Sequence, residues 1–200
     1  GRAASDGGDI GDTATGERLV ALAVDELGGL DIVVNTAGFL RDRMIFNLSE
    51  QDWDAVIRVH LRGHYSTIRP ASAYWRSRRD PEANNRIINF TSASGLHGSP
   101  GQPNYAAAKM AIVGFTQSLA QSLARYGVTA NAISPGAATR LTATIPEDKV
   151  VADMSEDPAM SPENVAVVAE YLAGERSRWL TGRVVSAVGY HVGLYNVPHG

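Results

Sequence analysis

Residues 86–109 read RIINFTSASGLHGSPGQPNYAAAK, and this stretch decides the fold. It opens with a short apolar run, which is typical of a buried parallel strand. A loop rich in Ser, Gly and Pro follows, and from residue 104 the pattern predicts a long helix. A strand, a loop and a helix in this order indicate one unit of an α/β sheet.

The start of that helix carries a tyrosine and a lysine, Tyr105 and Lys109, four residues apart. Residues at this spacing lie on the same helix face, one turn apart. The lysine cation can favour the ionised phenol, whose ordinary pKa is about 10. A tyrosine tuned in this way can donate a proton to a carbonyl or take one from an alcohol. The spacing alone is common in proteins, so its surroundings carry the argument.

Helices and strands alternate outward from this stretch. This alternation predicts a doubly wound parallel sheet with helices on both faces and right-handed crossovers. No linker divides the chain, so residues 1–200 form a single domain. We expect helices at 12–27, 50–75, 104–126 and 161–173, strands at 30–34, 86–90, 128–133 and 183–188, an irregular segment at 137–160, and a tail after 188.

Composition excludes several classes of function. The net charge of −3 provides no basic excess for a nucleic-acid backbone. Cysteine is absent, which excludes a disulfide scaffold, a thiol nucleophile and a thiolate metal site, and no histidine spacing suggests a metal ligand set. No apolar run approaches the ~20 residues of a membrane span, and no signal peptide opens the chain. We expect a cytoplasmic protein that binds neither nucleic acid nor a membrane.

Three loops follow predicted strands and carry polar or glycine residues. They are residues 35–38, 91–104 and 135–142. Parallel α/β sheets place their chemistry in loops at the carboxyl ends of strands. The helix that bears Tyr105 enters at the same edge, so we expect these loops to surround it.

These residues resemble the short-chain dehydrogenase/reductase family over nearly the whole chain. The resemblance implies a Rossmann-like fold and an NAD(P)-dependent oxidoreductase that interconverts a secondary alcohol and a ketone. The elements that carry it are Asp9-Ile10, the turn Asn35-Thr36-Ala37-Gly38, Ser92 thirteen residues before Tyr105, the Tyr105/Lys109 pair, and Pro135-Gly136.

The resemblance also implies a role for each matching residue. Tyr105 would be the general acid or base, Lys109 would lower its pKa and bind the nicotinamide ribose, and Ser92 would polarise the substrate oxygen. Ser94 is the rival for that last role. The residues expected at the cofactor, besides Tyr105 and Lys109, are Asp9 and Ile10 at the adenine, Asn35, Ala37 and Gly38 on the adenosine side, Pro135 and Gly136 at the nicotinamide, and Thr139, with Thr142 as a further candidate, at the carboxamide or diphosphate.

His60 stands where the family often has an asparagine that helps to anchor a water in the proton relay. It is a catalytic candidate, although a packed, hydrogen-bonded histidine is the alternative. The surrounding Val-His-Leu-Arg-Gly resembles the dehydrogenase part of the peroxisomal multifunctional enzyme type 2, or 17β-hydroxysteroid dehydrogenase type 4, and its bacterial relatives. This branch implies a 3-hydroxyacyl-CoA or steroid substrate. A 3-oxoacyl carrier-protein reductase is the alternative, since residues 101–105 also resemble that branch.

The glycine-rich diphosphate loop T-G-x-x-x-G-x-G, with which the family begins, has no match before Asp9. We therefore expect a domain that lacks its first βαβαβ portion and exposes one side of the strand at 30–34. A non-catalytic remnant that self-associates is a further alternative. The cofactor is NAD or NADP, with NAD favoured by the branch. The resemblance implies a homo-oligomer, a dimer or tetramer, built on helices 50–75 and 104–126 and on the last strand.

Overall fold

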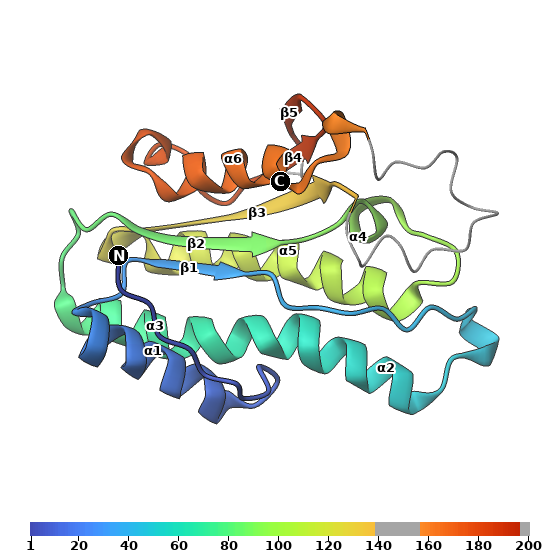
Figure 1. The fold of residues 1–200 in the computed structure, drawn as a ribbon, viewed down its shortest axis with the longest axis horizontal. Helices are drawn as coiled ribbons and strands as arrows, with labels where there is room; N and C mark the ends of the chain where they lie inside the picture. The colour runs from blue at the N-terminus through green and yellow to red at the C-terminus, as the bar shows by residue number, and fades with distance from the viewer. Residues whose placement is uncertain (139–156, 197–200) are drawn as a thin grey trace.

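The computed structural model describes residues 1–138 and 157–196. Its centre is a five-stranded sheet in the order β1-β2-β3-β4-β5 (Figure 1). Strands β1 to β4 pair in parallel, and β5 pairs with β4 antiparallel. The predicted α/β class is confirmed, with one antiparallel strand added. The strands are β1 (Ile32–Asn35), β2 (Asn85–Phe90), β3 (Val128–Gly136), β4 (Val184–Val188) and β5 (His191–Leu194).

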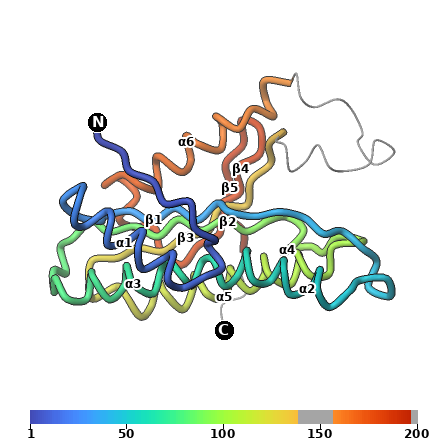
Figure 2. The backbone as a smooth tube through the Cα atoms, turned by 60° about the horizontal axis from the view of Figure 1, so that its bottom comes forward, coloured from blue at the N-terminus to red at the C-terminus, as the bar shows by residue number. Residues whose placement is uncertain are grey.

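Helices lie on both faces of the sheet. The helices α3 and α5 cover one face, α1 packs against α3, and α6 covers the other face (Figure 2). No helix in the described ranges is both long and apolar enough to cross a membrane. The α-helices are α1 (Thr13–Leu27), α2 (Glu50–Ile57), α3 (Gly63–Arg78), α4 (Ala93–His97), α5 (Pro103–Leu123) and α6 (Pro162–Ala173), and the short turns are η1 (Ile45–Asn47), η2 (Arg58–Arg62), η3 (Ala124–Tyr126), η6 (Pro158–Met160) and η7 (Glu175–Ser177).

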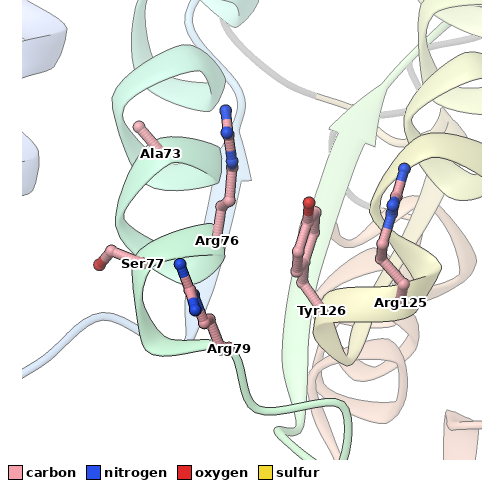
Figure 3. Close-up of a pocket in the computed structure, with 6 residues that line it drawn as sticks. All are labelled: Ala73, Arg76, Ser77, Arg79, Arg125 and Tyr126. Atoms are coloured by element: carbon pink, nitrogen blue, oxygen red, sulfur yellow. The ribbon is translucent and has the colours of Figure 1, made fainter.

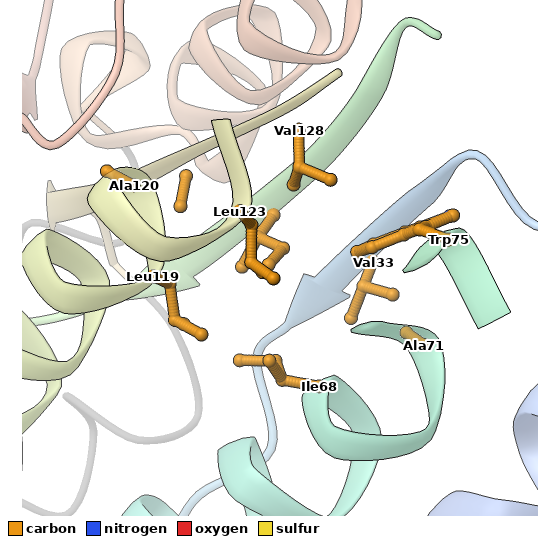
Figure 4. Packing of buried hydrophobic residues seen from close by; sticks show 10 residues of the cluster. Val33, Ile68, Ala71, Trp75, Leu119, Ala120, Leu123 and Val128 are labelled. Carbon is orange, nitrogen blue, oxygen red and sulfur yellow. The ribbon is translucent and has the colours of Figure 1, made fainter. Parts of the chain in front are cut away.

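The larger core lies between the sheet and the pair α3 and α5 (Figure 4). Trp75 is 1% exposed, and its indole N–H donates to the Leu30 carbonyl at 2.6 Å, which ties the end of α3 to the start of β1. The second core lies between α6 and the opposite face. Its members are Ile88, Ile133, Val165, Val168, Leu172, Leu180, Val185 and Ala187.

β1 is an edge strand of the described sheet, and only one of its faces is covered. Val33 is buried against α3, whereas Ile32 and Val34 are 39% and 47% exposed. The second core packs α6 over β2, β3 and β4 and stops short of β1. The predicted exposure of one side of this strand is therefore confirmed.

The predicted single helix over 50–75 is wrong in its interior. A π-helical turn, η2, separates α2 from α3 and contains the buried His60. Such turns insert one extra residue into a helix and are frequent at functional sites. The sequence pattern does not reveal this turn, because the residues that form it are also compatible with an uninterrupted α-helix.

The tail after residue 188 was also predicted wrongly, because it forms β5. Gly189 has φ of +59°, a conformation that favours glycine, and it lets the chain reverse after β4. The new strand HVGL is short and exposed along its whole length, so it carries no apolar alternation. Two smaller differences are that β1 begins two residues later than expected and that the predicted loop 91–103 contains the short helix α4.

Gly16 allows α1 and α3 to pack closely. A Cβ at this position would lie 1.9 Å from the Ser66 carbonyl oxygen. Pro70 lies four residues after Ser66 inside α3 and has no N–H to offer that carbonyl. The two residues together create a close backbone approach that a larger side chain would obstruct.

Candidate active site

The loops at the carboxyl ends of β1 and β2 meet the N-terminal end of α5, and the third predicted loop, at 135–142, is described only to residue 138. Pro103 occupies the first turn of α5, where a missing N–H costs nothing. The fully buried Asn104 fixes this helix end, because its side-chain amide lies within hydrogen-bond distance of the carbonyls of Arg41 (3.2 Å) and Asp52 (3.3 Å). Its side-chain oxygen accepts from the Tyr105 N–H at 2.8 Å. The position of Tyr105 is thus set by two other parts of the chain.

Lys109 lies one turn further along α5 and is 5% exposed. Its Nζ donates to the Phe90 carbonyl at 2.7 Å and lies 5.6 Å from the centre of the Tyr105 ring. The Thr91 hydroxyl donates to the Lys109 carbonyl at 2.7 Å. Burial lowers the pKa of Lys109 to about 8, and no carboxylate among the described residues offsets this effect. The result is a buried amine close to a buried phenol.

Ser92 completes the group around the phenol of Tyr105. Burial raises the pKa of Tyr105, a hydrogen bond with the Ser92 side chain lowers it, and the charge of Asp42 raises it further. Burial is the largest of these influences, so the net shift of the Tyr105 pKa is upward. The structure brings Ser92 to the phenol, whereas the rival Ser94 donates its backbone N–H to the Ser92 hydroxyl at 3.2 Å.

His60 lies beside Tyr105 in the π-helical turn. The two rings meet edge to face with centroids 5.0 Å apart, and His60 is 1% exposed. Its Nε2 lies 2.8 Å from the Phe39 carbonyl oxygen. Burial, and then the charge of Lys109, lower the pKa of His60 to about 4, so the imidazole is neutral at pH 7. Its Nδ1 is buried and meets no hydrogen-bond partner within the described ranges.

The absence of a side chain at Gly38 leaves the space that the His60 ring occupies. A Cβ on Gly38 would lie 2.2 Å from His60 Cε1. The spacing of residues does not reveal this contact, and the resemblance assigns this glycine only to the close approach of the cofactor. The adjacent Ala37 is exposed at the same sheet edge.

The side chain of Asn35 does not line an open site. It is buried, accepts from the Thr67 hydroxyl at 2.7 Å, and donates to Asn89 at 3.1 Å. Asn89 in turn donates to the Thr116 hydroxyl at 2.9 Å. The Asn35 side chain is therefore part of a chain of hydrogen bonds that joins α3, β1, β2 and α5, and it does not face an open cofactor site.

Asp9 and Ile10 are fixed against α2 and α3. The Asp9 carboxylate pairs with Arg58 and accepts from the Gly11 N–H, and both contacts lower its pKa. The Ile10 carbonyl accepts from the Ser66 hydroxyl at 2.7 Å. These contacts hold the segment in a defined position at the start of α1.

Pro135 and Gly136 end β3 and pair with the end of β4. A Cβ on Gly136 would lie 2.8 Å from a methyl group of Val188, so the strands approach closely here. Both residues lie at the carboxyl edge, as predicted. Thr139 and Thr142 lie outside the described residues.

Two further residues near the site, Asp42 and Gln102, were not predicted. The Gln102 side chain donates to Asp42 at 2.8 Å, and the Arg43 N–H donates to the Gly101 carbonyl at 2.8 Å. These bonds join the loop after β1 to the segment before Tyr105. No residue-type pattern marks such a pairing, because its partners are 60 residues apart.

Comparisons with known proteins agree with this geometry. The family model described as "Enoyl-(Acyl carrier protein) reductase" matches residues 4–191. A crystal structure of a short chain dehydrogenase from Mycobacterium avium superposes with a TM-score of 0.87 at 43% identity, and the match covers 100% of this chain and 66% of that one. The chain belongs to the short-chain dehydrogenase/reductase family.

Several curated relatives carry more specific names. The hydroxyacyl-CoA dehydrogenase ChsB1 of Mycobacterium tuberculosis is 45% identical, over 96% of this chain and 62% of its own length. The peroxisomal multifunctional enzyme type 2 of Mus musculus is 40% identical, over 80% of this chain and 20% of its own. The 3-oxoacyl-[acyl-carrier-protein] reductase FabG of Thermotoga maritima is 36% identical, over 86% and 70%. The chain thus spans less than two thirds of the length of ChsB1 and of the multifunctional enzyme.

Proposed function

We propose that the protein is an NAD(P)-dependent oxidoreductase that interconverts a secondary alcohol and a ketone, with a 3-hydroxyacyl-CoA as the favoured substrate. The observation that carries the proposal is the group formed by the buried Tyr105 and Lys109 and the half-buried Ser92 at the carboxyl edge of a parallel sheet. The substrate class is supported by the names of ChsB1 and the multifunctional enzyme. A hydroxysteroid is the second substrate in the same class of reaction.

In ketone reduction, Ser92 and Tyr105 would both contact the substrate oxygen. The Ser92 hydroxyl donates a hydrogen bond to the carbonyl oxygen, where negative charge develops. The Tyr105 phenol then transfers its proton to that oxygen. Because burial raises the pKa of Tyr105, the phenol is protonated at pH 7 and ready to act as an acid. In alcohol oxidation the phenolate takes the proton, and the Lys109 cation stabilises the phenolate.

The residues around Lys109 fit the nicotinamide half of a dinucleotide. One N–H of its ammonium is donated to Phe90, and the other two meet no acceptor in the described part of the chain. These two donors would hold ribose hydroxyl groups, and Pro135 and Gly136 would face the nicotinamide. When bound, the cofactor supplies or accepts the hydride. We favour NAD over NADP on the resemblance to the multifunctional-enzyme branch.

His60 is proposed as a positioning residue. A neutral imidazole that contacts the Tyr105 ring and the Phe39 carbonyl fixes the phenol relative to the loop after β1. Its unpartnered Nδ1 would form a hydrogen bond with a water or a substrate group, as donor or as acceptor according to the tautomer. Proton transfer itself remains assigned to Tyr105.

We also propose a cytoplasmic homo-oligomer. Tyr65 on α3 and Met110 on α5 are 44% and 47% exposed, and Val192 and Leu194 on β5 are 66% and 57% exposed. Large apolar side chains at these levels of exposure support contacts with a second copy through the long helices and the last strand.

Substitution of Tyr105 tests the proposal. In the full-length gene product, Tyr105→Phe should lower kcat by roughly 10²-fold or more, because general acid–base catalysis contributes about that much. The exposed Tyr65→Phe is the matched control and should keep wild-type turnover. Turnover of Tyr105→Phe within twofold of wild type would refute the assignment.

A 3-oxoacyl carrier-protein reductase is the second candidate, supported by the 36% identity to FabG. Steady-state kinetics with 3-hydroxyacyl-CoA and NAD, and with a 3-oxoacyl carrier protein and NADPH, would separate the two. Nicotinamide cofactor binding by the 200-residue chain, measured by thermal shift, addresses the remnant alternative. Absence of cofactor binding by this chain would support the remnant alternative, and binding would exclude it.

A further inference from the structure

A pocket lies at the opposite end of the long helices from Tyr105. It has a volume of about 620 Å³ and is lined by residues from the ends of α3 and α5 (Figure 3). Arg125 is 20 residues beyond Tyr105 along α5 and η3, which corresponds to about 30 Å at 1.5 Å per residue. The pocket is therefore separate from the candidate active site. Its lining residues are Ala73, Arg76, Ser77, Arg79, Arg125 and Tyr126.

Three of the six lining residues are arginines, and none is acidic. Arg76 and Arg79 come from the end of α3, Arg125 comes from η3, and the phenol of Tyr126 stands between the two sides (Figure 3). All three arginines are exposed to solvent. Like charges held around one cavity repel one another, so a binding anion would relieve this repulsion.

The nearest acidic residues in the sequence are occupied elsewhere. Asp80 follows Arg79 directly, and its carboxylate accepts from the Glu82 N–H at 2.9 Å. Glu82 pairs with Arg178 at 2.7 Å. Across residues 1–138 and 157–196, no carboxylate forms an ion pair with any of the three pocket arginines.

Helix polarity alone does not account for the cluster. A helix C-terminus carries about half a negative charge, which one cation offsets. The last turn of α3 contains Arg76 and Arg78, and η3 at the end of α5 contains Arg125. Arg78 lies outside the pocket lining and stacks over Tyr74 at 6.0 Å. Since Arg78 and Arg125 would be enough for the two helix ends, Arg76 and Arg79 are in excess of what helix polarity requires.

We propose that this pocket binds a small molecule that carries two or more phosphate groups. Guanidinium groups recognise phosphate oxygens through paired N–H donors, and three of them exceed what a single phosphate group requires. The volume also accommodates a ligand larger than one phosphate ion. This site is independent of the oxidoreductase reaction, so its test does not depend on activity.

Binding of inorganic pyrophosphate, measured by isothermal titration calorimetry, tests the proposal, with inorganic phosphate as the weaker comparison. The wild-type protein should bind one pyrophosphate per chain. Arg76→Gln and Arg125→Gln should each weaken binding by roughly tenfold or more, because hydrogen bonds to charged groups are lost. Arg78→Gln is the matched control, since it removes the same charge from the same helix end, and it should bind within about twofold of wild type.

Three results would overturn the proposal. One is no pyrophosphate binding by the wild-type protein. Another is equal weakening by Arg78→Gln and Arg76→Gln, which would indicate diffuse attraction and not a site. The third combines two observations. The wild-type protein does not bind pyrophosphate, and sedimentation velocity shows that Arg76→Gln converts an oligomer into smaller species. The arginines would then face a second copy of the chain. Circular dichroism confirms that each variant is folded.

Discussion

Acidification from pH 7 to pH 5 should destabilise the fold through two buried histidines. His60 and His64 lie one turn apart and are 1% and 2% exposed. Burial, followed by the charge of Lys109, lowers the pKa of His60 to about 4 and that of His64 to about 3. In the unfolded chain a histidine titrates near pH 6.5. Between these values the unfolded state binds more protons than the folded state.

The sign and size of the effect follow from this difference. The stability linked to these histidines is fully present above about pH 6.5 and is lost as the pH falls toward the folded-state pKa values. At pH 5 proton binding by each histidine in the unfolded chain lowers the free energy of unfolding by about 2 kcal/mol. The two histidines together lower it by about 4 kcal/mol. This is a large part of the 5–15 kcal/mol that typically stabilises a domain.

Urea unfolding followed by far-ultraviolet circular dichroism at pH 7, 6 and 5 measures this loss. His64→Asn removes one of the two titrating groups, so its free energy of unfolding should fall by about 2 kcal/mol less than that of the wild type. His97→Asn is the control, because His97 is exposed on α4, and it should follow the wild type. If His64→Asn lost as much stability as the wild type between pH 7 and 5, the reasoning would be refuted.

Two further predictions concern packing and the site. Gly16→Ala should cost about 1–3 kcal/mol of unfolding free energy because its Cβ would meet the Ser66 carbonyl. Gly114→Ala, with nothing within 4 Å, should add roughly 0.5–1 kcal/mol, and urea unfolding that ranks the two variants equally would contradict this. Asp42→Asn should shift the pH midpoint of alcohol oxidation to lower pH, because the Asp42 charge raises the pKa of Tyr105. An unchanged midpoint would show that the Asp42 charge does not influence the pKa of Tyr105.

The sequence predicted most of the fold because its strands are short apolar runs and its helices keep their apolar spacing. It located the loops of the site, and the thirteen-residue spacing separated Ser92 from Ser94 as the partner of the phenol. The turn at 58–62 was missed because its residues also fit an uninterrupted α-helix, and β5 was missed because all of its residues are exposed.

The electrostatics of the site could not be predicted from spacing. The positions of Tyr105 and Lys109 indicated that a cation lies near a phenol, but they contained no information on burial. Burial acts on both groups and favours their uncharged forms, so it raises the pKa of the tyrosine and lowers that of the lysine. The side-chain direction of Asn35 was likewise hidden, because it depends on which face of β1 is covered by α3.

The contacts that hold the proton-transfer groups come from a short part of the chain. Lys109 bonds Phe90, Tyr105 bonds Ser92, and His60 bonds Phe39, so every partner lies between residues 39 and 109. The exposed face of β1, with Ile32 and Val34, lies outside this set. The acid–base half of the site is thus built independently of whatever covers β1. Tyr105→Phe should therefore lower kcat by roughly 10²-fold or more while changing the affinity for a nicotinamide cofactor far less.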